Sequence, residues 1–209
     1  WSPGDNREIM SGKELVEAFS LERVSKNPAV FDQKKLDWFN SRYLQATEPE
    51  SILDAAAELL IGAGVVKKET LKKRREYLCD IIRLLQPRLK RLTELPSQME
   101  YFFKAPEEYE EKAVKKRWLK PGVEQRLEVC RNKLADIDEW SEKNIEEVVR
   151  GCAADEDVGA GKYIHPVRLS LTGSGSSPGL FEVMELLGKE RVMSRLEKAE
   201  KWLKTKKKD

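Results

Sequence analysis

The sequence contains very little histidine and cysteine. Its 209 residues include one histidine, His165, and three widely spaced cysteines, Cys79, Cys130 and Cys152. A single histidine supplies neither the ligand set of a zinc site nor the members of a conventional catalytic triad. An odd number of distant cysteines is typical of reduced thiols in the cytoplasm rather than of a disulfide framework. We therefore expect a cytoplasmic chain with no catalytic residue, no metal ligand and no bound cofactor.

Long apolar runs and an excess of one charge are also absent. No apolar stretch approaches the roughly 20 residues that cross a bilayer, so we expect a soluble protein without a membrane partner. Basic residues number 39 and acidic residues 37, and this near balance excludes a general attraction to polyanions. The chain starts Trp1-Ser-Pro-Gly without a methionine or a signal-peptide pattern, which indicates a piece cut from inside a longer protein.

Apolar residues recur instead at helical spacing. Leu180, Val183, Met184 and Leu187 fall at i, i+3, i+4 and i+7, which is one stripe of a helix. No segment shows the alternation of apolar strands with helices that builds a parallel sheet, so the sequence predicts an all-α fold. Helix starts are expected at or just after Ser11, Asp32, Pro49, Glu69, Pro106, Pro121 and Ser141, and the helix from Glu69 should continue to Pro87.

A run of small residues separates two helical patterns near the C-terminus. In this elbow, Gly173-Ser-Gly-Ser-Ser-Pro-Gly179, Ser177 is a good N-cap and Pro178 fits the first helical position. The elbow would combine the free N–H groups of a helix start with an exposed Leu180 and the nearby Arg168. Together these groups could bind a nucleotide base or a phosphate. The alternative is an ordinary loop between two packed helices, because few helix elbows bind a ligand.

Basic residues gather between Lys67 and Arg91, where acidic residues are few. At the end of this segment, Pro87 should stop the helix and hold Arg88 on a fixed backbone. Arginine is the side chain suited to two-point recognition of bases and phosphates, so the segment predicts an RNA contact. The alternative is a solvated helix face without a ligand.

The sequence resembles bacterial glutamyl-tRNA synthetases toward both its N-terminal and its C-terminal ends. The C-terminal similarity is carried by His165-Pro166-Val167-Arg168, Leu171-Thr172-Gly173, Ser177-Pro178-Gly179-Leu180-Phe181-Glu182 and Leu186-Leu187-Gly188-Lys189-Glu190-Arg191. The N-terminal similarity is carried by the run from Val24 to Leu44, which follows the nucleotide-binding signature loop in that family. The similarity covers essentially the whole chain.

The resemblance implies three parts. Residues 1–46 would be a stem-contact region, and 47–92 and 93–209 would be two units of a helical anticodon-binding cage. The two ATP signatures of class I synthetases, His-Ile-Gly-His and Lys-Met-Ser-Lys-Ser, do not occur in the chain. The resemblance therefore implies that ATP, with Mg²⁺, binds in the catalytic domain of a full-length glutamate–tRNA ligase, and that this chain alone is inactive.

The resemblance also implies a partner and a site. The partner would be glutamate tRNA, together with the catalytic domain of the same protein, and we expect a monomer. Arg88 would read the third anticodon base and favour glutamate tRNA over glutamine tRNA, while residues of the elbow would surround the other two bases. The tRNA-binding residues would be Arg88, Arg168, Ser177, Pro178, Leu180, Lys72 and Arg75.

Two alternatives to this function stay open. The chain can be a helical module that binds protein through the Leu180 elbow and uses its basic helix for solubility. The full-length protein can also be a non-discriminating synthetase that accepts glutamine tRNA.

A different motif, Gly159-Ala-Gly-Lys162, faintly resembles a phosphate loop but lacks the spaced first glycine and a following Ser or Thr, so it predicts no nucleotide site. Trp38, Phe39, Trp118 and Trp140 are expected in the core.

Overall fold

The structure, a computed structural model, describes residues 1–5, 7–28 and 30–206, and the basic tail expected at Lys204–Lys208 lies partly outside these ranges. No strand occurs in the described ranges, so the predicted all-α fold is confirmed. The α-helices are α1 (Gly12–Ala18), α2 (Gln33–Ala46), α3 (Pro49–Gly62), α4 (Lys68–Lys73), α5 (Arg75–Leu85), α6 (Leu95–Phe103), α7 (Glu111–Ala113), α8 (Val123–Ala135), α9 (Glu142–Asp155), α10 (Gly161–Thr172), α11 (Leu180–Leu187) and α12 (Lys189–Lys206). Short 3₁₀ turns, η1 (Leu21–Arg23), η2 (Gln86–Arg88) and η3 (Leu92–Glu94), and a π-turn, η4 (Val114–Trp118), complete the fold.

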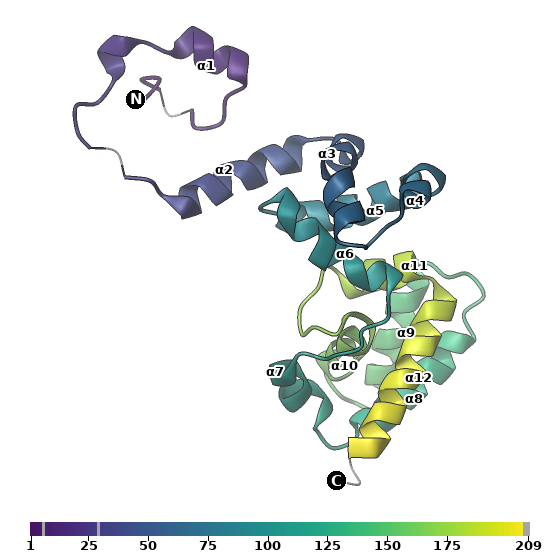
Figure 1. The fold of residues 1–209 in the computed structure, drawn as a ribbon. Coiled ribbons are helices and arrows are strands. Elements are labelled where there is room, and N and C mark those ends of the chain that lie inside the picture. Colours follow the sequence, from purple (N-terminus) through teal and green to yellow (C-terminus); the bar gives the residue numbers. More distant parts are fainter. Residues whose placement is uncertain (6, 29, 207–209) are drawn as a thin grey trace.

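An N-terminal region, which comprises the described residues of 1–46, projects from the helical body, and its last helix, α2, makes the connection (Figure 1). Its helix starts are confirmed, because Ser11 forms a capping box with Glu14 and Asp32 caps α2 through two backbone N–H groups. Trp38 is 43% exposed, so its expected burial in the core is wrong; it lies on an outer face of α2, and Phe39 is half-buried. Within the described ranges, each helix is too short or too polar to cross a bilayer.

The body starts with α3 packed against α5. Pro49 takes the first position of α3, as predicted. The single helix expected from Glu69 is wrong, because the backbone turns at Arg74 (φ −126°, ψ 32°) and separates α4 from α5. The reason is burial: α4 buries none of its side chains, whereas α5 directs Leu78 and Ile82 into the core. Leu71 of α4 is only partly buried against the core, so packing holds α4 less firmly than α5 and does not keep the two in line.

A buried glutamine joins α2 to this body. The side-chain amide of Gln86 donates hydrogen bonds to the carbonyl oxygens of Leu44 at 2.7 Å, Gln45 at 3.2 Å and Thr47 at 2.7 Å. These carbonyls lie at the end of α2, where the regular helical donors run out, and the Leu44 carbonyl also accepts from the Thr47 N–H at 3.1 Å. In return, the Gln45 amide donates to the Pro87 carbonyl at 3.1 Å. The backbone leading into Arg88 is therefore fixed from both sides.

The C-terminal bundle packs α8, α9, α10 and α12 together, with α11 lying against α9 and near α5 (Figure 1). Trp118 lies at its centre, 1% exposed, with its ring centroid 4.5 Å from that of Tyr109 and 5.1 Å from that of Trp202. Its indole N–H donates to the Pro166 carbonyl at 3.1 Å. The expected core position of Trp118 is confirmed, and Trp140 is half-buried against the core.

The helix expected at Pro106 does not form. The segment between α6 and α7 runs along the elbow instead, and the Glu110 N–H donates to the Gly173 carbonyl at 2.8 Å. Pro106 itself lies against Gly173, whose hypothetical Cβ would approach it to 2.9 Å. Helices near the other expected starts do form, since α8 begins at Val123 just after Pro121 and Ser141 caps α9.

A buried arginine of α12 holds the bundle to earlier segments. Arg195 is 4% exposed and donates to the carbonyls of Leu171 at 2.6 Å and Lys104 at 3.2 Å. Burial and the neighbouring Arg191 lower the pKa of Arg195 to about 10, so it remains charged at neutral pH. The two carbonyl dipoles stabilise this charge where water is excluded.

Candidate nucleic-acid interface

The elbow between α10 and α11 is held in one conformation. Gly173 has a φ of +74°, and a Cβ there would come within 2.9 Å of the Glu108 carbonyl oxygen, so the close approach requires glycine. The Glu110 carboxylate accepts hydrogen bonds from the Gly175 N–H at 2.8 Å and the Ser174 hydroxyl at 3.2 Å. The small residues of the elbow therefore form a fixed loop rather than a loose connection.

The start of α11 differs from the prediction. The helix begins at Leu180 with Gly179 as its N-cap, so Ser177 is not the N-cap and Pro178 is not the first helical residue. Leu180 is 2% exposed and Pro178 is buried, so the expected exposed apolar platform is wrong. The apolar stripe starts at Leu180 itself and packs inward. The Glu182 carboxylate also folds back beside Gly179, which leaves the helix start unsuited to a phosphate.

Two arginines from distant segments meet at Ser177. Arg88, in η2, donates from Nη1 to the Ser177 carbonyl oxygen. Arg168, on α10, donates from Nε to the Ser177 hydroxyl at 3.0 Å, and its Nη1 lies 3.4 Å from Nδ1 of His165. The structure thus brings together three of the residues predicted from sequence, and each arginine keeps N–H groups without a partner in the described chain.

A hollow of about 370 Å³ opens beside this meeting point, and we call it the arginine hollow. The lining consists of Leu85, Arg88, Ser97, Gln98, Tyr101, Thr172, Ser174, Ser176, Ser177 and Pro178, none of them acidic. The Tyr101 hydroxyl is buried and has no hydrogen-bond partner in the described ranges, and burial raises its pKa. Hydroxyl, amide and guanidinium groups that converge on one concave surface suit the polar edges of a base or a phosphate.

The electrostatics of Arg168 favour an anion at this place. Burial lowers the pKa of Arg168, and the positive charges of Arg88 and Arg117 lower it further. Neither Arg168 nor Arg88 forms an ion pair with a carboxylate of the described residues. A half-buried guanidinium beside another cation is unfavourable until an anion or a strong acceptor arrives. Arg168 contacts the lining residue Ser177 without lining the arginine hollow itself, and its charge adds to that of Arg88 to favour an electron-rich ligand there.

Lys72 and Arg75 lie away from the arginine hollow. Arg75 begins α5 and Arg88 follows its end, so the helical rise separates them by about 16 Å or more. The Arg75 guanidinium makes two 2.8 Å hydrogen bonds to the Asp54 carboxylate, which already balances its charge. Lys72 is exposed on α4 and has no ion pair in the described chain.

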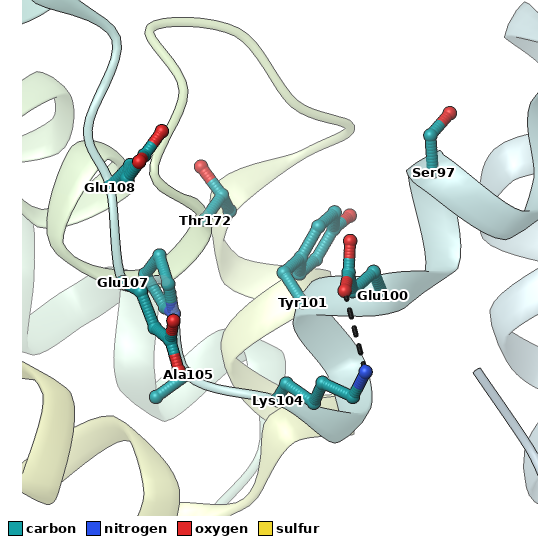
Figure 2. A pocket seen from close by; sticks show the side chains of 9 residues that line it. Ser97, Glu100, Tyr101, Lys104, Ala105, Glu107, Glu108 and Thr172 are labelled. Atoms are coloured by element: carbon teal, nitrogen blue, oxygen red, sulfur yellow. Dashed lines mark ion pairs between the residues drawn. The ribbon is translucent and has the colours of Figure 1, made fainter. Parts of the chain in front are cut away.

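A neighbouring hollow of about 440 Å³ has the opposite character. Figure 2 shows Glu100 and Tyr101 projecting from α6, with Lys104 directly after the helix and Glu107 and Glu108 on the segment that follows. Three carboxylates line this hollow against one ammonium group, and Lys104 already lies 3.6 Å from Glu100. The charge disfavours a phosphate here, so the arginine hollow is the better candidate for RNA.

Sequence reasoning missed part of the lining. Tyr101 stands between the two hollows and contributes to both, and Gln98 lines the arginine hollow. The aromatic cluster from Tyr101 to Phe103 was the available signal, but such clusters predict packing more often than binding.

Comparison with known proteins identifies the family of the chain. A family model of anticodon-binding domains matches residues 33–200. The chain is 37% identical over 203 residues to the glutamate–tRNA ligase of Moorella thermoacetica, an alignment that covers 97% of this chain and 41% of that protein. It is 38% identical over 191 residues to glutamate–tRNA ligase 2 of Rubrobacter xylanophilus, covering 91% of this chain and 38% of that protein.

A solved structure shows the same arrangement of helices. The crystal structure of a glutamate tRNA ligase from Elizabethkingia meningosepticum, in complex with its amino acid, superposes with a TM-score of 0.84 at 33% identity, covering 97% of this chain and 39% of that one. The chain thus spans about two fifths of the length of the relatives it matches. Arg88, Arg168 and Ser177 all lie inside the family match, and the predicted resemblance is confirmed. The chain belongs to the family of anticodon-binding domains, in the form found in glutamate–tRNA ligases.

Proposed function

We propose that the chain binds the anticodon arm of glutamate tRNA and that the arginine hollow receives its unpaired bases. The observation that carries this proposal is the meeting of Arg88 and Arg168 at Ser177, without a compensating carboxylate in the described lining. Single-stranded RNA loops present base edges to such donors, while phosphate contacts set the position of the strand. A rigid concave surface between two helical segments is therefore suited to one RNA triplet.

Arg88 is the residue we assign to the third anticodon base. Gln86 and Pro87 fix its backbone, and its Nη1 is held by the Ser177 carbonyl, so its remaining N–H groups point from a defined position. Arg168 and Ser177 would contact the other two bases. Pro178 would support this surface from below, because it is buried. Leu180 has no direct contact in this proposal.

The rest of the chain would position the tRNA. We assign residues 1–46 to the inner corner of the tRNA, residues 47–92 to a first anticodon-binding unit and residues 93–209 to a second. Lys72, exposed on α4, would attract the phosphate backbone without sequence preference. Arg75 would contribute less, because Asp54 balances its charge.

The chemistry of the full-length protein would take place elsewhere. We propose that ATP, with Mg²⁺, activates glutamate on a catalytic domain outside this chain, in a cytoplasmic and monomeric ligase. No group of three His, Cys, Asp or Glu side chains that could hold a metal ion occurs among the described residues. In this proposal, the side chains of the described residues bind and orient RNA and take no part in a catalytic step.

A protein-binding module is the less favourable function. That alternative needs an exposed apolar surface at the elbow, and Leu180 and Phe181 are both buried. The arginine hollow instead offers charged and hydroxyl groups. These groups favour RNA over an apolar protein surface.

A binding measurement tests the proposed function. A glutamate tRNA transcript should bind the chain more tightly than an unrelated tRNA of equal length. Arg88→Gln should reduce the preference for the correct third anticodon base by about 1–3 kcal/mol, or roughly 5- to 150-fold, because one two-point base contact is lost. Arg83→Gln, on the preceding helix α5 and paired with Asp80, is the matched control and should change little. Equal affinity for both tRNAs would refute the proposal.

A charging assay tests the choice between the two tRNAs. A full-length ligase that carries this segment should charge glutamate tRNA in preference to glutamine tRNA, and Arg88→Gln should weaken that preference. The melting temperature of the variant should stay close to that of the original chain, because Arg88 is exposed. Equal charging of both tRNAs by the original protein would show a non-discriminating enzyme and contradict the role of Arg88.

A further inference from the structure

A second basic hollow, of about 610 Å³, opens between η4 and the start of α10, and we call it the lysine hollow. The lining consists of Lys116, Arg117, Lys120, Pro121, Val123, Arg126, Gly159, Gly161, Lys162, His165 and Pro166. The lining includes five cationic side chains and no acidic one. Neither the basic segment before Arg91 nor the elbow contributes to it.

Most of this positive charge is not compensated. Arg126 is the exception, because its guanidinium makes hydrogen bonds of 2.6 to 3.0 Å to the Glu156 carboxylate. Glu156 also accepts from the Tyr163 hydroxyl at 2.9 Å, so this acidic group is fully engaged. The other four cationic side chains form no ion pair within the described residues. Like charges gathered around a concave surface focus a positive potential there and attract an anion.

The backbone of η4 is shaped to hold this cluster. The Leu119 N–H donates to the Val114 carbonyl at 3.0 Å, which is the wide hydrogen-bonding pattern of a π-turn. Trp118 anchors the turn through its hydrogen bond to Pro166 on α10. Lys116 and Arg117 lie between these fixed points and so stand against the start of α10. Single π-turns frequently occur at functional sites.

The lysine hollow adjoins the arginine hollow. His165 lines the former, and its Nδ1 lies 3.4 Å from Nη1 of Arg168, which in turn contacts Ser177 of the latter. Burial lowers the pKa of His165, and the charges of Arg117, Arg168 and Lys116 lower it further. Arg117 of the lysine hollow therefore acts on both His165 and Arg168, which contacts Ser177 of the arginine hollow.

We propose that the lysine hollow binds the sugar-phosphate backbone of the RNA strand that continues from the anticodon bases in the arginine hollow. This inference rests on the proposed function and adds a second contact to it. Lys116, Arg117 and Lys162 supply the cationic groups for the phosphates. The contact carries affinity and not base specificity, because every nucleotide has the same phosphate.

Gly159 leaves the hollow open. No atom lies within 4 Å of a hypothetical Cβ at this position, and its backbone does not require a positive φ. A longer side chain at Gly159 is thus compatible with the fold and enters the hollow. Although Gly159-Ala-Gly-Lys162 is no phosphate loop by its spacing, its glycine and lysine both line the surface assigned to phosphate.

The first test measures how RNA binding depends on salt. In the full 209-residue chain, Lys116→Gln together with Arg117→Gln should lower the slope of log affinity against log salt by about 1–2 with a glutamate tRNA transcript, since each lost phosphate contact contributes about 0.7–0.9. The discrimination between transcripts that differ in one anticodon base should remain. Lys112→Gln with Lys115→Gln is the matched control, because these exposed lysines are neighbours in sequence but do not line the hollow.

A second pair of variants isolates charge from shape. Gly159→Glu should weaken tRNA binding roughly 10-fold relative to Gly159→Gln at low salt, and the difference should disappear at high salt because exposed charges are screened. Equal affinity of these two variants, or a salt slope of the double variant equal to that of its control, would overturn the inference while leaving the anticodon site intact. If the original chain binds no tRNA, the proposed function and this inference both fail.

His165 provides a single-residue probe of the hollow, because the sequence contains no other histidine. Binding of the tRNA transcript should raise the pKa of His165 in a proton NMR titration, since phosphate offsets the neighbouring cations. The rise should be lost in the Lys116→Gln, Arg117→Gln double variant. Inorganic phosphate at the same ionic strength should give a smaller rise; an equal rise would identify a site for the free ion and contradict the assignment to RNA.

Discussion

The N-terminal region and the helical body are both built from helices, but different forces hold them. Among the described residues of 1–46, the buried hydrophobic side chains are Met10 and Leu44, while α1 buries none. One continuous core includes Leu44 near the end of α2 and runs through the body from α3 to α12. Local caps such as Ser11 and Asp32 start the N-terminal helices, whereas apolar packing stabilises those of the body.

A few polar contacts connect the two regions. Gln86 donates to the end of α2, and the Arg91 guanidinium binds the Asp37 carboxylate through two hydrogen bonds of 2.8 and 3.0 Å. Many large apolar side chains of the N-terminal region remain exposed, among them Trp1, Phe19, Val30, Phe31, Leu36 and Trp38. The comparison shows that a region can have well-capped helices and still depend on its neighbour for position.

A pair of tryptophan substitutions should give the largest contrast between the regions. Trp118→Ala should destabilise the body by about 3–5 kcal/mol, because a fully buried ring is replaced by a cavity. Trp38→Ala should change stability by less than about 1 kcal/mol, because the side chain is 43% exposed and lies outside the core. Urea unfolding followed by circular dichroism measures both, and a similar loss in the two variants would contradict the comparison.

The junction should respond to a smaller change. Gln86→Met leaves three carbonyl acceptors at the end of α2 without a side-chain donor, so we expect a loss of about 1–3 kcal/mol. Hydrogen exchange should accelerate in α2 and remain slow in α9, because the body keeps its core. Gln45→Met removes only two exposed hydrogen bonds, to Pro87 and from Arg42, and is the control. Faster exchange throughout α9 would show that the two regions unfold together.

Acid should produce the smallest effect, and only in the body. The pKa of His165 is lowered in the folded chain, so the unfolded chain binds more protons as the pH falls below the ordinary value of about 6.5. Stability should therefore decrease from pH 7 toward the folded-state pKa. Thermal unfolding at pH 7.5 and 5.5 measures this decrease, and His165→Gln should reduce it. An unchanged pH dependence in the variant would assign the effect to carboxyl groups.

Features that depend on neighbours along the chain are predictable from the sequence. Ser11, Asp32 and Ser141 cap helices because a short polar side chain reaches the next backbone N–H groups. Features that depend on distant segments are not predictable in this way. Pro106 starts no helix because its segment runs along the elbow, and α4 separates from α5 because only α5 buries a face.

The candidate site shows the same division. The sequence indicates Arg88 as a candidate because it follows a proline, and Ser177 because it lies in a glycine-rich elbow. The resemblance to a known family implies the role of each. Their meeting depends on how α5 and α11 pack, which no local pattern encodes. Leu180 was assigned to an exposed surface although it begins the apolar stripe of α11, and that stripe pointed to its burial.

The separation of Arg88 and Ser177 by 89 positions also has a consequence for biosynthesis. A nascent chain that has emerged from the ribosome as far as α9 already displays the lysines and arginines of α4 and α5. It has no elbow, however, and thus no arginine hollow. Under the proposed function, a chain that stops before the elbow should therefore associate with RNA only loosely, and selection of the anticodon should arise only after the elbow has been synthesised.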